Sequence, residues 1–155
     1  MEIIFDRRLI ALDQNITSAS QAIELSGTLL ARQQICRPEY ITAMLDVYKD
    51  FGPAIVIDSG LAMPHARPEK GAIRTGFSLI TTRQPLHFGH EEFDPVSVII
   101  GIAGAGADAD ADNHIKMIQI IATLIESDIV SFLREEHDIN AVFNFIHNKM
   151  ESSLC

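Results

Sequence analysis

The chain has 155 residues, 47% of them hydrophobic, which is enough for one domain with a sizeable core. Its formal net charge of −9, from 21 acidic and 12 basic residues, argues against a nucleic-acid partner, because phosphate backbones are bound by clustered Lys and Arg. No signal peptide or membrane span is expected, since the apolar stretches are short or interrupted by Lys116 and Gln119. Two cysteines without a disulfide framework favour a cytoplasmic protein.

The first third of the chain predicts a strand followed by two helices. A short apolar run favours a strand at 9–12. A helix over 17–31 begins at Thr-Ser, a pair that can cap its free N–H groups. A second helix begins at Pro38, whose fixed φ suits the first helical position, and ends before Gly52.

The middle of the chain is typical of strands. Apolar, β-branched runs predict strands at 54–58, 74–82 and 95–103, with a turn at 68–71. The run 95–103 has almost no polar alternation, which indicates a strand buried on both faces.

The C-terminal third is typical of helices. The segment 104–112, rich in Gly, Ala and Asp, is interpreted as a flexible acidic loop. Helices are then expected at about 114–126, 128–134 and 138–148, capped by Asp112 or Asn113, and by Asp138 for the last. Helices on both sides of a run of strands predict an α/β fold, namely a single-domain three-layer α/β/α sandwich with a central β-sheet flanked by helices.

The most informative stretch is 60–68, which reads GLAMPHARP and places His65 between a predicted strand and a proline-rich turn. Pro64 and Pro68 restrict the backbone on either side of it, and Arg67 brings a fixed positive charge close to the ring. A neutral imidazole beside a guanidinium suits the uptake of a phosphoryl group, because the ring nitrogen attacks while the cation balances the arriving charge. The alternative is an ordinary surface histidine in a turn.

His114 is the second candidate, in the first turn of a predicted helix. Free backbone N–H groups and the helix dipole favour anions there, so His114 could hold a phosphate oxygen carried by a neighbouring residue. The alternative is a plain helix-start residue that faces solvent. Both histidines are expected at the ends of elements, where ligands bind in open α/β sheets, but the sequence does not show that they meet.

Three other patterns are weaker. His87 and His90, followed by two glutamates, resemble a metal clip, but no second cluster completes a ligand set. The segment 108–112 resembles the start of a calcium loop but lacks the required glycine and glutamate. Cys36 is interpreted as a buried structural thiol rather than a reactive thiolate. No metal and no cofactor is therefore expected.

Several of these segments together resemble a known family. The motif 60–68, the strand 75–81, the run 94–103 and the helix start 114–118 are similar to EIIA type-2 domains, of the mannitol/fructose type, from the bacterial sugar phosphotransferase system (PTS). The resemblance extends over about 5–148, so that the whole chain, 1–155, is taken as one EIIA domain. It implies a mixed sheet between helices.

The resemblance also implies an activity and partners. In such systems phospho-HPr passes a phosphoryl group to an EIIA histidine, EIIA passes it to a cysteine or histidine on EIIB, and the EIIC membrane subunit couples transfer to sugar entry. His65 matches the phosphorylated histidine, and His114 matches the second histidine that lies close to it. The chain is then a phosphotransferase component that carries a phosphohistidine.

One departure from the family pattern concerns an arginine. Mannitol- and fructose-type members carry Arg in the helix before the motif, after a Met-Leu-Asp-like run, but here 44–46 is followed by Val47. We expect Arg67 to supply the missing charge. The segment 48–57, with the Pro-His-Ala-Arg-Pro that follows, is most similar to the ascorbate-specific branch. L-ascorbate is therefore the expected sugar of the system, although EIIA itself never touches it.

Two other functions remain open at this point. One is a regulatory EIIA-like protein that signals by its phosphorylation state, which a neighbouring EIIB or EIIC gene would distinguish. The other is a metal-dependent hydrolase that uses His65, His114 and nearby acids. For the phosphocarrier, Leu61, Met63 and Phe88 are expected to form an apolar ring on which HPr and EIIB dock in turn. The oligomeric state, including a homodimer, is not predicted.

Overall fold

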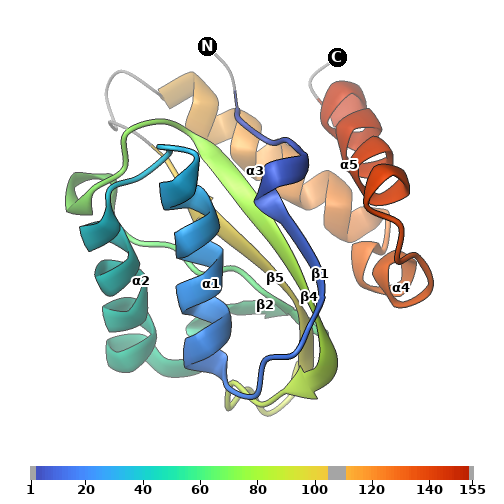
Figure 1. The fold of residues 1–155 in the computed structure, drawn as a ribbon, viewed down its shortest axis with the longest axis horizontal. Coiled ribbons are helices and arrows are strands. Elements are labelled where there is room, and N and C mark those ends of the chain that lie inside the picture. The colour runs from blue at the N-terminus through green and yellow to red at the C-terminus, as the bar shows by residue number, and fades with distance from the viewer. Residues whose placement is uncertain (1–2, 105–110, 154–155) are drawn as a thin grey trace.

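The computed structural model describes residues 3–104 and 111–153, and these contain a five-stranded mixed sheet (Figure 1). The strands are β1 (Ile10–Gln14), β2 (Val56–Asp58), β3 (Leu61–Ala62), β4 (Gly76–Leu86) and β5 (Val96–Ala103). Their order across the sheet is β1-β4-β5-β3-β2. β1 runs parallel to β4 and β3 parallel to β5, whereas β4–β5 and β2–β3 are antiparallel.

Helices cover both faces of this sheet. Figure 1 shows α1 (Ala19–Arg32) and α2 (Pro38–Phe51) together on one side, with α3 (Ala111–Glu126), α4 (Ile129–Glu135) and α5 (Ile139–Ser153) on the other. Three short 3₁₀ turns, η1 (Arg7–Leu9), η2 (Gly52–Ile55) and η3 (Pro68–Lys70), connect these elements. The predicted three-layer α/β/α sandwich is confirmed. No helix in the described part of the chain is both long and apolar enough to cross a membrane.

The first two helices form where the capping signals predict and then pack very closely. The Ser18 hydroxyl accepts a hydrogen bond from the Gln21 N–H at 3.2 Å, and Pro38 is the first residue of α2. A Cβ on Gly27 would lie 2.9 Å from Ile41 Cγ1 and 3.1 Å from Met44 Sδ. Glycine lowers helix propensity, but at this position it lets α1 and α2 approach each other.

The centre of the sheet is buried on both faces, as predicted for β5. A Cβ on Gly101 would lie 2.7 Å from the Ser26 Cβ, so α1 packs directly onto the middle of β5. The buried Ser78 hydroxyl on β4 donates to the Ser26 carbonyl at 2.9 Å, which satisfies a polar group within the core.

The main differences from the predicted elements are these. The turn η2 extends over Gly52–Ile55, so only the last part of the predicted strand 54–58 is β2. The two-residue strand β3 was not predicted, and β4 runs four residues further than expected, to Leu86. α3 begins at Ala111, so that Asp112 and Asn113 lie inside its first turn rather than capping it. α5 extends beyond 148, to Ser153. Most of the predicted acidic loop, 105–110, lies outside the described residues.

The cap predicted for the last helix, Asp138, is present, and α4 has a cap of the same kind. The Asp128 carboxylate accepts from the Ser131 N–H at 3.4 Å, before α4. The Asp138 carboxylate accepts from the Ala141 N–H at 2.9 Å, before α5. Each carboxylate satisfies one of the unpaired N–H groups of a first helical turn.

Candidate functional site

The segment that carries His65 follows β3 and is hydrogen-bonded on both sides. The Ile102 N–H, near the end of β5, donates to the Pro64 carbonyl at 2.9 Å, and the Met63 N–H donates to the Ile55 carbonyl at 2.8 Å. Pro64 is buried, whereas His65 is exposed. The segment is therefore held in place along the sheet while its histidine faces solvent.

A buried tyrosine on α2 fixes the other end of this segment. The Tyr40 hydroxyl donates to the Ile102 carbonyl at 2.8 Å and accepts from the Ala66 N–H at 3.0 Å. Burial raises the pKa of Tyr40 to about 12, so the hydroxyl keeps its proton at neutral pH. The sequence pattern assigns no role to Tyr40. The available signal was that a buried tyrosine hydroxyl requires a hydrogen-bond partner.

The backbone defines which nitrogen of His65 is free. Its Nδ1 lies 2.8 Å from the Met63 carbonyl oxygen. A carbonyl can only accept, so Nδ1 carries the proton and donates, and in the neutral ring Nε2 keeps the lone pair. The result is an exposed imidazole with a defined tautomer and Nε2 as its nucleophilic atom.

The topology brings His114 to the same edge of the sheet as His65, namely the edge formed by the ends of the strands. β3 and β5 are parallel, so their C-terminal ends both lie there. His65 follows β3, and α3 follows β5 along the chain, with His114 as the exposed fourth residue of α3. His114 thus lies in the first turn of a long helix, as predicted.

Arg67 lies two residues after His65, at the N-cap of η3, and is exposed. Its guanidinium makes no hydrogen bond or ion pair with any residue that the structure describes. Val47, where the family pattern has an arginine, is a half-buried residue on α2. Arg67 is thus the cation nearest to His65 along the chain, and no other described group holds its charge.

The expected apolar ring around His65 is wrong in two of its three members. Leu61 and Phe88 are 0% and 3% exposed, because Leu61 lies in β3 between two neighbouring strands and Phe88 packs edge-on against Tyr48. Met63 is half-buried. Closeness in sequence to the motif did not predict which side chains face outward.

Two exposed apolar side chains near this edge are on α3. Ile115 and Ile118 are each 56% exposed and, at positions adjacent to and four residues after His114, lie on the same side of the helix. The available signal was the number of apolar residues in α3, which exceeds what one buried face requires.

The weaker patterns gain little support. His90 Nδ1 accepts from the Glu92 and Phe93 N–H groups, both at 3.1 Å, so this nitrogen is occupied, while His87 is exposed. Within the described ranges, no three His, Cys, Asp or Glu side chains are close enough to hold a metal ion. Cys36 is buried, and its burial raises the pKa of the thiol to about 11. Most of the segment that resembled a calcium loop lies outside the described residues.

Comparison with known proteins identifies the family. Residues 3–149 match the family described as "Phosphoenolpyruvate-dependent sugar phosphotransferase system, EIIA 2". The chain belongs to this EIIA family. The resemblance found in the sequence is thereby confirmed, and with it a component of a phosphotransferase system.

Curated relatives of this EIIA chain are named as ascorbate-specific. The ascorbate-specific PTS system EIIA component of Salmonella choleraesuis (strain SC-B67) is 44% identical over 94 residues, which cover 61% of each chain. The protein of the same name from Escherichia coli (strain K12) is 41% identical over 98 residues, 63% of this chain and 64% of that one. Each match thus spans less than two thirds of the relative's length.

Solved structures agree on the fold. A putative PTS IIA from Streptococcus mutans superposes with a TM-score of 0.81 at 28% identity, over 94% of this chain and 91% of that chain. The mannitol-specific cryptic phosphotransferase enzyme IIA of Escherichia coli gives 0.78 at 31% identity, over 92% and 94%. Enzyme IIA in the Escherichia coli mannitol complex with phosphorylated enzyme IIB gives 0.80, over 95% and 99%, but at 23% identity it supports the fold alone.

Proposed function

We propose that this EIIA chain is a cytoplasmic phosphocarrier, which accepts a phosphoryl group from phospho-HPr on His65 and passes it to EIIB for coupled uptake of L-ascorbate. The observation that carries the proposal is the hydrogen bond between His65 Nδ1 and the Met63 carbonyl, which leaves Nε2 as an exposed nucleophile. The names of the curated relatives support the sugar.

In the proposed step, the Nε2 lone pair attacks the phosphorus while the bond to the donor breaks. Nδ1 keeps its proton and its bond to the Met63 carbonyl, so the ring nitrogen that gains positive character is already paired with an acceptor. His114 donates a hydrogen bond to a phosphoryl oxygen from the first turn of α3, where the helix dipole also favours the negative charge. Arg67 balances the remaining charge. Transfer to EIIB reverses these movements.

Both partners would use the exposed apolar side chains of α3. Ile115 and Ile118 flank His114, so a partner that covers them also excludes water from His65. HPr and EIIB must each reach the same Nε2 atom, so they compete for one surface and bind briefly. The net charge of −9 steers a partner that is basic, so association with such a partner should weaken as salt increases.

The decisive experiment is labelling of the purified protein by phospho-HPr, followed by mapping of the label. We expect an acid-labile, base-stable phosphoramidate on Nε2 of His65, and no label on His65→Ala. His147→Ala changes an exposed histidine on α5 and is the matched control. Normal labelling of His65→Ala would overturn the assignment. NMR of the ring nitrogens in the free protein would show separately whether Nδ1 carries the proton.

Onward transfer distinguishes the carrier from a regulatory protein. A carrier passes the label to the EIIB of an ascorbate system faster than to the EIIB of a mannitol system. A protein that is labelled on His65 but transfers to neither EIIB would have the regulatory function instead, and the assignment of His65 would still hold.

A further inference from the structure

A hollow of about 370 Å³ lies at the opposite edge of the sheet from His65. Thr81 in the middle of β4 pairs with Val98 near the start of β5, whereas the His65 segment is hydrogen-bonded to the end of β5. The end of β1, α4 and the connection between α4 and α5 complete the lining. The volume lies in the range of small-molecule sites, and no step of the proposed phosphoryl transfer uses this hollow.

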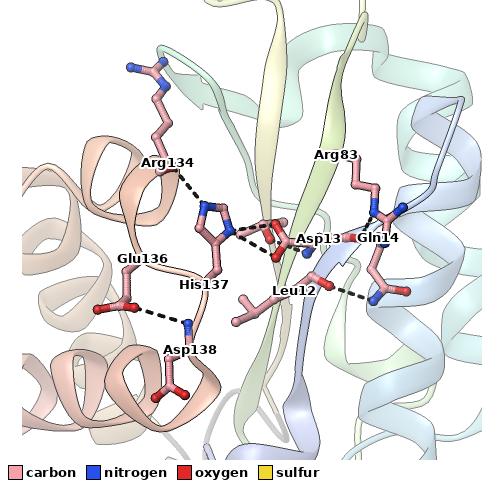
Figure 2. A network of polar contacts seen from close by, with 9 residues as sticks. Leu12, Asp13, Gln14, Arg83, Arg134, Glu136, His137 and Asp138 are labelled. Carbon is pink, nitrogen blue, oxygen red and sulfur yellow. Dashed lines mark hydrogen bonds and ion pairs between the residues drawn. The ribbon is translucent and has the colours of Figure 1, made fainter.

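The lining is basic, although the chain as a whole is acidic. Arg83, Arg134 and His137 line the hollow together with one carboxylate, Asp13, and the His137 Nδ1 lies 2.9 and 3.0 Å from the two carboxylate oxygens (Figure 2). His137 Nε2 lies 3.2 Å from the Arg134 carbonyl. Both ring nitrogens thus face acceptors, which favours the doubly protonated ring, and in that form His137 offsets the charge of Asp13.

The positive charges of Arg83 and Arg134 remain available to bind an anion. Arg83 donates from Nε to the Asp13 carbonyl at 3.0 Å, which leaves its terminal N–H groups for another acceptor. Figure 2 shows the Arg134 guanidinium directed away from the Asp13–His137 pair. Among the described residues no acidic side chain forms an ion pair with either guanidinium.

The residue at the rim of the hollow is conformationally strained and firmly held. Asp13 has a φ of 54°, in the left-handed region that most L-residues avoid and that Asp adopts when local hydrogen bonds support it. Its N–H donates to the Thr81 hydroxyl at 2.8 Å, its carbonyl accepts from Arg83, and its carboxylate accepts from His137. Every polar group of Asp13 is therefore paired. Strain that the surroundings maintain in this way is concentrated at ligand sites.

We infer that this hollow binds a small organic anion, with its phosphate or carboxylate group held by the terminal N–H groups of Arg83 and by Arg134 once its exposed side chain turns toward the hollow. The half-buried Ser97 offers a hydroxyl to the polar body of such a ligand, and Val98 and Leu133 supply an apolar wall. Guanidinium groups suit both anions because their N–H donors match pairs of oxygens. The site is remote from His65, so the ligand and a partner protein can bind at the same time.

The test is an NMR titration of the ¹⁵N-labelled full chain with glycerol phosphate as the phosphate ester and lactate as the carboxylate. We expect saturable shifts of the Asp13, Arg83 and His137 amides at millimolar concentration, and none with sodium chloride at equal ionic strength. Comparison of the glycerol phosphate and lactate titrations shows which anionic group the site prefers. The same shifts should appear in His65→Ala, so the result does not depend on the proposed phosphocarrier function.

Variants assign the shifts to the arginines. Arg134→Gln should weaken binding at least about tenfold, which corresponds to the loss of one charge-assisted contact. It leaves the Arg134 carbonyl, and with it the His137 contact, in place. Arg83→Lys keeps the charge but not the planar fork and should bind with intermediate affinity. Arg32→Gln changes an exposed arginine at the end of α1 and is the matched control.

Three results would overturn the inference. The first is no saturable shift with either anion in a folded protein, and the second is shifts confined to the His65 and His114 edge. The third is an unchanged affinity in Arg134→Gln. The amide spectrum and thermal unfolding of each variant show whether it is folded, so weak binding by a folded Arg83 variant cannot be attributed to unfolding.

Discussion

His65 and His137 are both exposed histidines at edges of the same sheet, yet their surroundings give them opposite chemistry. His65 has one ring nitrogen against a carbonyl and the other left free, which suits it to act as a nucleophile. His137 has a carboxylate against one nitrogen and a carbonyl against the other, which favours its protonated form. The comparison shows that the acceptors facing each nitrogen, rather than exposure, decide what a histidine does.

The largest effect is expected at the His65 edge, from His114→Ala. Removal of one donor to a developing phosphoryl charge costs about 10²–10³ in rate. The variant should still accept phosphate from HPr, slowly, and pass it to EIIB poorly, as measured by rapid quench of labelled protein. The control is His147→Ala, at an exposed position on α5. Normal onward transfer by His114→Ala would remove this residue from the mechanism.

Arg67 is expected to contribute less. A hydrogen bond to a charged group is worth about 1.5–3 kcal/mol, so Arg67→Ala should slow phosphorylation by HPr roughly 10- to 100-fold. Arg67→Lys keeps the charge without the planar guanidinium, so its rate of phosphorylation should lie between those of the parent and Arg67→Ala. The control, Arg32→Ala, should match the parent. If Arg67→Ala is as fast as the parent, another cation, such as Lys49 or Arg74, or none, balances the charge.

Tyr40→Phe tests whether the segment that carries His65 needs its buried anchor. The change leaves the Ala66 N–H and the Ile102 carbonyl without this partner, which should cost about 1–3 kcal/mol of the free energy of unfolding. Tyr48→Phe is the control, because the half-buried Tyr48 hydroxyl bonds only to the Phe88 carbonyl and water can replace it. Denaturant unfolding should show a smaller loss there, and equal losses would contradict the anchoring role.

The smallest effect is expected at the other edge, in the pH dependence of stability. The hydrogen bond to Asp13, with its charge, raises the pKa of His137 in the folded protein. The resulting stabilisation is fully present below the unfolded pKa of about 6.5 and is lost as the pH rises through the higher folded value.

His137→Gln should therefore flatten the stability profile above about pH 6.5, as measured by denaturant unfolding at several pH values. Asp13→Asn should do the same, because asparagine tolerates the left-handed backbone while it removes the charge. Profiles as steep as that of the parent in both variants would show that the pair does not contribute.

Much of the fold was predictable because its signals are local. Ser18 and Asp138 mark helix starts by their own capping bonds, and the unbroken apolar run of β5 indicated a fully buried strand. The two residues of β3 gave no such signal, because their strand conformation depends on pairing with β5 and β2. Asp112 and Asn113 resembled caps, yet the helix begins before them.

The candidate site was predictable only in part, for a similar reason. The prolines and the arginine around His65 indicated a constrained, charged setting, and the start of a helix indicated His114. Leu61 and Phe88 do not form the expected apolar surface, because strand pairing and ring packing turn them inward, which closeness in sequence does not report. The Asp13–His137 pair joins residues 124 positions apart, and no local pattern connects them.

Two backbone amides that hold the His65 segment can report on its motion. The Ala66 N–H donates to the Tyr40 hydroxyl oxygen, and the Ile102 N–H donates to the Pro64 carbonyl. If the segment detaches from the sheet as a unit, the two amides will exchange their hydrogens for deuterium together, at a rate that need not follow global unfolding. Comparison of the free and phosphorylated proteins by this exchange would show whether the carried group tightens or loosens the backbone beneath it.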